Sequence, residues 1–219
     1  ALPVAPLAFR APLPAGVEVV PVVFVANRVF RALPQSDVEA FADHVYKKIR
    51  AMAQAQGIAL REVQLDCDWS DGTRARYFHF LGRLRKLAHA QSLALSATIR
   101  LHQVKYPQRT GVPPVDRGML MLYNFGHLGA ETERSSIFNL PDAERYTSYI
   151  AAYTLPIDMA LPMFSWLVHG RDGNVMGLLE KVELSDLESS DAFARESSGR
   201  YVAERSLYFR GQYFMEGDR

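Results

Sequence analysis

Stretches rich in β-branched residues alternate along the chain with stretches whose apolar residues recur at helical spacing. Residues 17–26 read VEVVPVVFVA, which is typical of a strand covered on both faces. Residues 36–39 read SDVE, a capping-box pattern, and apolar residues then recur on one helical face from Val38 to Met52. The same order repeats, with strands predicted at 62–69, 93–102, 118–124 and 157–166 and helices at 77–87 and 141–153.

This alternation of strands and helices predicts parallel strand pairing through right-handed crossovers. The expected fold is therefore of the α/β class, a (β/α) TIM-type barrel in a single domain over residues 17–219. About five units are legible, whereas a closed barrel has eight. Beyond Gly170, strands are expected only at 175–182 and 207–214, on either side of a polar segment. Either the barrel is incomplete or irregular in its last third, or the chain is a fragment of a longer protein.

The first sixteen residues, ALPVAPLAFRAPLPAG, are rich in alanine and proline and are expected to form an extended linker or a processed N-terminus. Such a stretch often follows a removed export signal or a lipid anchor. The expected location is therefore outside the cytoplasm: periplasmic, lipid-anchored or secreted.

The composition narrows the function classes. Of 219 residues, 48% are hydrophobic and 22% charged, as in globular proteins, and the formal net charge of +1 lacks the basic surplus of nucleic-acid-binding proteins. The sequence has no apolar run of about eighteen residues, so no membrane span is expected. The single cysteine, Cys67, excludes an internal disulfide framework and a multi-cysteine zinc site. The sequence does not indicate an oligomeric state.

Polar residues share one face of two predicted strands. Side chains alternate along a strand, so Glu62, Gln64, Asp66 and Asp68 lie together, as do Ser96, Thr98, Arg100 and His102. The outer face of a barrel strand lies under helices, so the polar sets are expected to point inward. Cys67 then faces the helices as an inert core residue.

Polar residues also become denser toward the carboxyl end of each predicted strand. Because a barrel builds its active site at that end from several strands, these residues are expected to line one pocket. The loop at 103–117 leaves the same end and is long enough to form a lid or the wall of a subsite. The candidate pocket residues are Asn27, Asp66, Asp68, Trp69, Arg100, His102, Tyr123, Asn124 and Trp166.

Asp66 and Asp68 are the candidate catalytic pair. Two residues apart on a strand, their Cα atoms are roughly 6.5 to 7 Å apart. Two carboxyl groups close together tend to share a proton, which leaves an acid beside a base, as glycoside hydrolysis requires. Alternatively, either aspartate forms a structural ion pair with Arg100 or His102. The pair could also bind a divalent metal with His102, but a third strong ligand is not evident, so neither a metal nor a cofactor is expected.

The segment VQLDCDW at 63–69, followed by an amphipathic helix and LALSATIRL at 93–101, resembles family 18 glycoside hydrolases and related barrels of uncharacterised bacterial proteins. Chitinases of that family carry alternating aspartates on one strand, ending in a glutamate that protonates the glycosidic oxygen. Asp66 and Asp68 match the aspartates, and Ser70 occupies the glutamate's position. The resemblance implies a carbohydrate ligand, with an aspartate of the pair, or Asp71, as the acid.

The expected function is therefore glycoside-hydrolase-like action on a bacterial polysaccharide or glycan. Asp68 would serve as acid/base and Asp66 as its charged partner or nucleophile, while the other pocket residues position the sugar. Strand spacing does not choose between retention and inversion. The alternative is a non-catalytic glycan-binding or assembly protein on the same fold, which Ser70 favours. A metal-dependent hydrolase is a third hypothesis.

Overall fold

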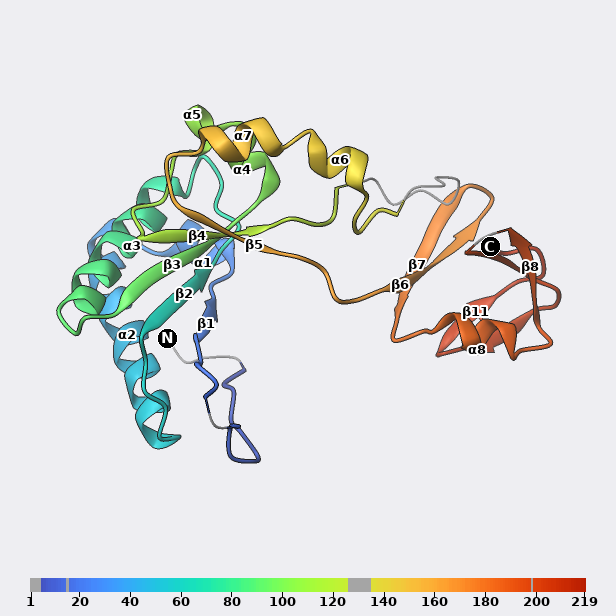
Figure 1. Ribbon diagram of the computed structural model, residues 1–219, viewed down its shortest axis with the longest axis horizontal. Helices are drawn as coiled ribbons and strands as arrows, with labels where there is room; N and C mark the ends of the chain where they lie inside the picture. Colours follow the sequence, from blue (N-terminus) through green and yellow to red (C-terminus); the bar gives the residue numbers. More distant parts are fainter. Residues whose placement is uncertain (1–4, 15, 126–134, 198) are drawn as a thin grey trace. The chain divides into compact units, whose positions relative to one another are not determined.

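The computed structural model describes residues 5–14, 16–125, 135–197 and 199–219. The chain divides into two compact units (Figure 1). The first, which we call the sheet unit, contains residues 1–121 and 146–160, and the second, the hairpin unit, contains residues 122–145 and 161–219. This division differs from the single barrel-like domain expected over 17–219. The linker expected at 1–16 lies partly outside the described residues, and its described part at 5–14 contains no helix or strand.

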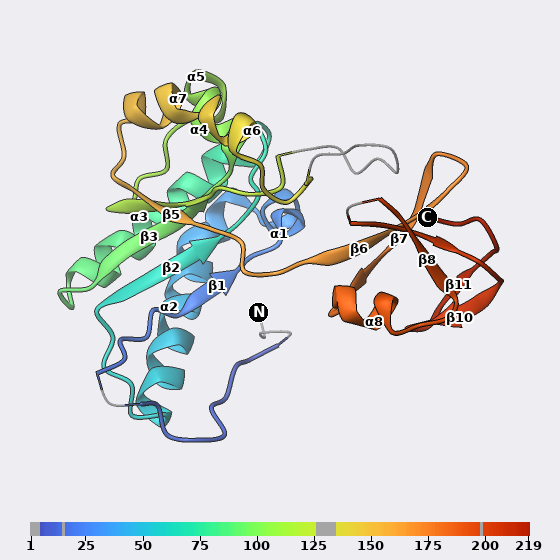
Figure 2. The same cartoon turned by 45° about the vertical axis from the view of Figure 1, so that its right-hand side comes forward.

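The sheet unit is built on five parallel strands, as the alternating pattern predicts. They are β1 (Val22–Phe24), β2 (Glu62–Asp66), β3 (Ala94–Ile99), β4 (Arg117–Met121) and β5 (Ile157–Ala160), in the spatial order β1-β2-β3-β4-β5 (Figure 2). In register, Phe24 pairs with Asp66, Leu65 with Ala97 and Ile99 with Leu120. The α/β class is confirmed, but the sheet is open. A complete barrel is not formed, because the described chain beyond β5 forms antiparallel hairpins instead of further parallel strands.

Helices follow each of the first four strands. They are α1 (Asn27–Ala32) with the 3₁₀ turn η1 (Gln35–Asp37) and α2 (Val38–Ala55), then α3 (Arg74–His89), then α4 (Leu101–Lys105) and α5 (Pro107–Thr110), and finally α7 (Thr147–Ala152). Figures 1 and 2 show α2 and α3 side by side against one face of the sheet. Between them lies an aromatic core in which the Phe30 ring is 5.3 Å from the rings of both Tyr77 and Phe80.

Some predicted elements differ in extent from their sequence pattern. The strand predicted at 93–102 ends at Ile99, because the Arg100 N–H donates to the Gln103 side chain at 2.8 Å and begins α4. The strand predicted at 157–166 stops before Pro162, which has no N–H for a ladder. The helix predicted at 141–153 is two short helices, α6 (Leu140–Glu144) in the hairpin unit and α7 in the sheet unit.

The hairpin unit consists of short antiparallel pairs around a core of its own. The pairs are β6 (Trp166–Arg171) with β7 (Asn174–Glu180), β8 (Phe193–Ser197) with β9 (Arg200–Ala203), and β10 (Leu207–Phe209) with β11 (Gln212–Phe214), and α8 (Leu184–Glu188) lies between β7 and β8 in the chain. Two-residue turns close the first and last pairs, and Gly173 and Gly211 have φ values of 77° and 82° there. Leu179, Leu187 and Phe214 are buried in the core. The expected irregularity of the last third is therefore observed.

Within the described residues, no helix is both long and apolar enough to cross a membrane.

The hydroxyl of Tyr77 is buried and has no hydrogen-bond partner among the described residues. Burial raises the pKa of Tyr77 well above its usual value. Because an unpaired buried hydroxyl costs free energy, we expect Tyr77→Phe to raise the free energy of unfolding in urea by about 1 kcal/mol. Tyr201→Phe is the matched control: its hydroxyl donates to Glu188 at 3.0 Å, so that substitution should lower the value by about 1 kcal/mol. A less stable Tyr77→Phe protein would contradict the expectation.

Candidate functional site

One face of the sheet carries a row of polar side chains near the amino ends of its strands. The Ser96 hydroxyl donates to the Glu62 carboxylate at 2.5 Å. Arg117 pairs with Glu62 and, at 3.2 Å, with Asp158. Glu62 and Ser96 are buried. Together, these contacts join β2, β3, β4 and β5 across the face. Such a row is structural, since its carboxylates are occupied by partners within the sheet.

A second group lies at the carboxyl ends of β2 and β3, and we call it the Asp-Arg-Asp cluster (Asp66, Asp68 and Arg100). The Thr98 hydroxyl donates to Asp66 at 2.6 Å, and the Arg100 Nη2 lies 3.2 Å from the same oxygen. Arg100 Nε donates to Asp68 Oδ1 at 2.5 Å. The structure therefore brings together three of the residues that the sequence analysis placed at one pocket. The guanidinium between the two carboxylates offsets their mutual repulsion.

The two aspartates of the cluster differ in exposure. The side chain of Asp66 is 22% exposed, that of Arg100 27%, and that of Asp68 61%. Asp66 is held by Thr98 on β3 and by Arg100 just after it, whereas Asp68 lies beyond the last residue of β2 and is open to solvent. Asp68 is thus the more accessible of the two carboxylates. Asp66 is placed to orient Arg100.

Asn27 lies beside this end of the sheet, in a hydrogen-bonded trio with Ser70 and Thr73. The Thr73 hydroxyl donates to Asn27 Oδ1 at 2.6 Å, and the Ser70 N–H donates to Thr73 Oγ1 at 2.9 Å. Asn27 Nδ2 is 3.4 Å from Ser70 Oγ. Ser70, at the position of the chitinase acid, is therefore part of the turn that begins α3. Sequence reasoning missed Thr73, although a serine and a threonine three residues apart before a helix signal such a turn.

His102 lies on α4, not on a strand as predicted, because β3 ends at Ile99. Burial lowers the pKa of His102; Asp68 opposes this effect, and Arg109 and Arg100 reinforce it. The imidazole is therefore neutral near pH 7. It can donate or accept one hydrogen bond with a ligand.

Trp69 does not have the exposed position that sugar stacking requires. The residue is 5% exposed, its indole N–H donates to the Thr110 carbonyl at 2.9 Å, and its ring stacks on Tyr77 at 5.2 Å. This corrects the expectation that Trp69 contacts the ligand: an aromatic residue after a strand packs inward when α3 supplies aromatic neighbours. Cys67 is buried as expected, and burial raises its pKa to about 12, so its thiol stays protonated.

The loop predicted at 103–117 is ordered into α4 and α5. Buried Gln103 accepts from the Arg100 N–H and thereby fixes the backbone of the cluster. The Lys105 ammonium lies 5.3 Å from the ring centre of Tyr106 and 5.8 Å from that of Tyr149 on α7. Tyr106 and Tyr149 are 46% and 39% exposed, so these rings are accessible. A role for this segment as a subsite wall stays a prediction.

Tyr123, Asn124 and Trp166 belong to the hairpin unit. The ring of Phe164 lies 5.7 Å from that of Tyr123 and 5.4 Å from that of Trp166. Asn124 has a positive φ of 59°, and its N–H donates to the Ile137 carbonyl at 2.7 Å, so it shapes a turn. That these three residues share a pocket with Asp66 and Asp68 stays a prediction. Among the residues that the model describes, no three His, Cys, Asp or Glu side chains gather as metal ligands.

No protein-family model matches this sequence, and no curated protein matches it.

Solved structures provide the comparison. The model matches ydhD of Bacillus subtilis, described as a sporulation-specific glycosylase, with a TM-score of 0.51 and 16% identity over 78% of this chain and 61% of that one. Catalytic domain 2 of the group II chitinase of Ostrinia furnacalis has a TM-score of 0.48 at 16% identity, covering 75% of this chain and 50% of that one. The spore cortex-lytic enzyme SleL of Bacillus cereus has a TM-score of 0.47 at 16% identity, covering 74% and 40%. The chain thus spans less than two thirds of each of these structures. Its match to the glycosylase shows that it has a distant glycoside-hydrolase-like fold.

Proposed function

We propose that this chain is a glycoside-hydrolase-like protein that acts on a bacterial polysaccharide or glycan at the Asp-Arg-Asp cluster. The observation that carries the proposal is the convergence of Asp66, Asp68 and Arg100 at the carboxyl ends of adjacent parallel strands. In α/β folds this edge of the sheet is where ligands bind. The fold shared with a glycosylase supports a carbohydrate as the ligand. Action outside the cytoplasm is part of the proposal.

The exposure of the two carboxylates suggests their roles. Asp68 is the more exposed and would act as acid/base toward the glycosidic oxygen, while Asp66 would be its charged partner or the nucleophile. Arg100 would hold both carboxylates in place before the sugar arrives, which reduces the ordering cost of binding. His102 and Asn27 would donate to sugar hydroxyls. These roles require a neutral, polyhydroxylated ligand that can exchange hydrogen bonds with the cluster.

Asp68→Asn tests the catalytic assignment. We expect the substitution to lower the release of reducing ends from a panel of bacterial polysaccharides at least a hundredfold, because an amide neither donates nor accepts the catalytic proton. The far-ultraviolet circular dichroism and the melting temperature should stay unchanged, since Asp68 is exposed.

Asp71→Asn is the matched variant. Asp71 is 66% exposed and lies 3.8 Å from Arg109, so its loss should leave both fold and turnover intact. Activity that persists in Asp68→Asn removes Asp68 from the mechanism, and activity lost only in Asp71→Asn assigns the acid to that residue.

The second candidate is a non-catalytic glycan-binding or assembly protein on the same fold. Two observations favour it: Ser70 stands where the chitinase acid stands, and it is already bonded within the turn to Thr73. Isothermal titration with oligosaccharides separates the candidates. Binding that Arg100→Gln weakens, with no reducing ends from the wild-type protein on prolonged incubation, identifies the binding protein. Turnover by the wild-type protein rejects it.

A further inference from the structure

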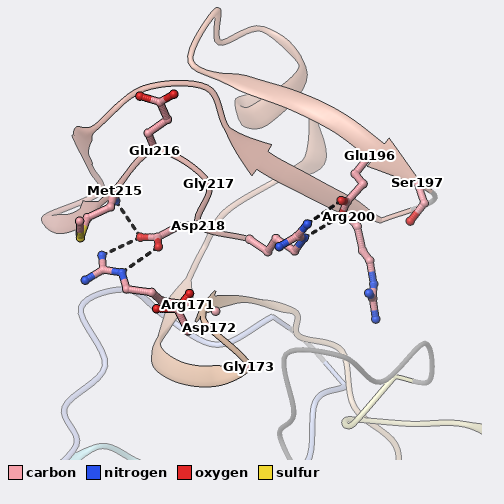
Figure 3. Close-up of a pocket in the computed structure, with 12 residues that line it drawn as sticks. Arg171, Asp172, Gly173, Glu196, Ser197, Arg200, Met215, Glu216, Gly217 and Asp218 are labelled. Atoms are coloured by element: carbon pink, nitrogen blue, oxygen red, sulfur yellow. Dashed lines mark hydrogen bonds and ion pairs between the residues drawn. The ribbon is translucent and has the colours of Figure 1, made fainter.

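Two hollows in the hairpin unit meet at Arg200 on β9. One, of about 540 Å³, is lined on one side by Trp166, and we call it the Trp166 cavity. The other, of about 860 Å³, lies among residues 170–173, 196–197, 200 and 215–219 (Figure 3). Arg200 lines both. Arg219 lines both as well.

Arg200 differs from the other arginines around it in having an unsatisfied donor. Arg171 binds both oxygens of Asp218, at 2.7 and 2.6 Å, and Arg219 binds both oxygens of Glu196, at 2.9 Å. Figure 3 shows these bonds and shows Arg200 extending away from them. Nη2 of Arg200 is buried and has no hydrogen-bond partner in the part of the chain that the model describes. A ligand can supply the hydrogen-bond acceptor that this buried N–H group lacks.

The walls of the Trp166 cavity are mainly apolar. Glu183 also lines it, and the backbone carbonyl of this residue accepts the Asp186 N–H at 3.0 Å at the start of α8. The volume of the cavity lies in the range of small-molecule sites, which combine apolar walls with a few polar groups. Besides Trp166, the apolar lining residues are Leu167, Val168, Val182, Leu184, Leu187, Phe193, Tyr201 and Phe214.

We propose that the Trp166 cavity binds an organic carboxylate with an apolar body. The carboxylate accepts two hydrogen bonds from Arg200, because two N–H groups of the planar guanidinium can each bind one of the two carboxylate oxygens. The hydrocarbon body lies against Trp166 and Phe193, where its apolar surface is removed from contact with water. A sugar acid suits these walls less well, because its hydroxyls would lose hydrogen bonds against leucine and valine side chains. The residues of this cavity belong to the hairpin unit, and those of the Asp-Arg-Asp cluster belong to the sheet unit.

Isothermal titration of the full chain with decanoate, 1-decanol and glucuronate tests the proposal, each ligand below its aggregation concentration. We expect decanoate to bind at least tenfold more tightly than the other two. Arg200→Gln should weaken decanoate at least tenfold and leave 1-decanol unchanged. The matched control is Arg205→Gln: Arg205 is 56% exposed and pairs with Asp191, and its loss should leave decanoate binding unchanged.

A second variant keeps the test decisive if Arg200→Gln does not fold. Leu184 lines the cavity, is 57% exposed and is the first residue of α8, where an acidic residue suits the helix dipole. Leu184→Asp should therefore fold and repel the carboxylate, weakening decanoate at least threefold. Equal binding of glucuronate or 1-decanol by the wild-type protein would overturn the proposal, as would decanoate affinity that neither variant changes. The Asp68→Asn protein should bind decanoate normally, so this result is independent of glycan turnover.

Discussion

Asp218→Asn is expected to lower the free energy of unfolding of the hairpin unit by about 3–5 kcal/mol, because it removes the negative charge of a buried ion pair. Asp218 is 3% exposed and binds Arg171 through both oxygens. It also accepts the Met215 N–H at 2.7 Å and lies 2.7 Å from the Nε2 of buried His169. An amide in its place leaves the guanidinium without a counter-charge. Hydrogen exchange followed by mass spectrometry should show faster exchange in β6, β7 and β11.

The pH dependence provides the control for this prediction. The hydrogen bonds from Arg171, followed by those from Met215 and His169, hold the pKa of Asp218 well below its usual range, although burial opposes them. A carboxyl group whose pKa is lower in the folded than in the unfolded state stabilises the fold at pH values above the unfolded-state pKa, which is about 3.9. This stabilisation is lost as the pH falls from the unfolded-state pKa toward the folded-state pKa. Thermal melting between pH 7 and pH 2 should show a smaller loss of stability for Asp218→Asn than for the wild type. Parallel curves would contradict the role given to Asp218.

Phe80→Ala is expected to lower the free energy of unfolding of the sheet unit by about 3–5 kcal/mol. Phe80 of α3 is fully buried, and its ring lies 5.3 Å from that of Phe30 on α1 and 5.2 Å from that of Phe41 on α2. The substitution leaves a cavity that these rings cannot close without moving the helices. Urea denaturation monitored by circular dichroism measures the loss.

The matched control for Phe80 is its neighbour on the same helix. His79 is 41% exposed and faces Glu39 at 3.1 Å, so His79→Ala should change the free energy of unfolding by less than about 1 kcal/mol. Because alanine favours a helix more than either original residue does, similar losses in the two variants would contradict the packing role given to Phe80.

Much of the candidate site follows from the alternation of side chains along two strands. That periodicity put Asp66, Asp68 and Arg100 on one face, and parallel pairing of β2 with β3 then brought them into contact. The burial of Trp69 against α3 also agrees with the alternation, because Trp69 has the same parity as Cys67. The position of His102 could not be predicted in this way, because the Gln103 side chain accepts from the Arg100 N–H and a helix begins there. That contact is not encoded by the strand pattern.

The sequence by itself determined the order of strands and helices, the parallel sheet and the apolar or polar character of each strand face, because these features repeat at intervals of two or about four residues. Only the tertiary structure decided that the sheet is open, that one guanidinium bridges both aspartates, and that Arg200 keeps an unpaired nitrogen while Arg171 and Arg219 are neutralised. Each of these depends on which distant residues meet. Arg171 and Asp218, for example, are 47 positions apart, and no local period connects them.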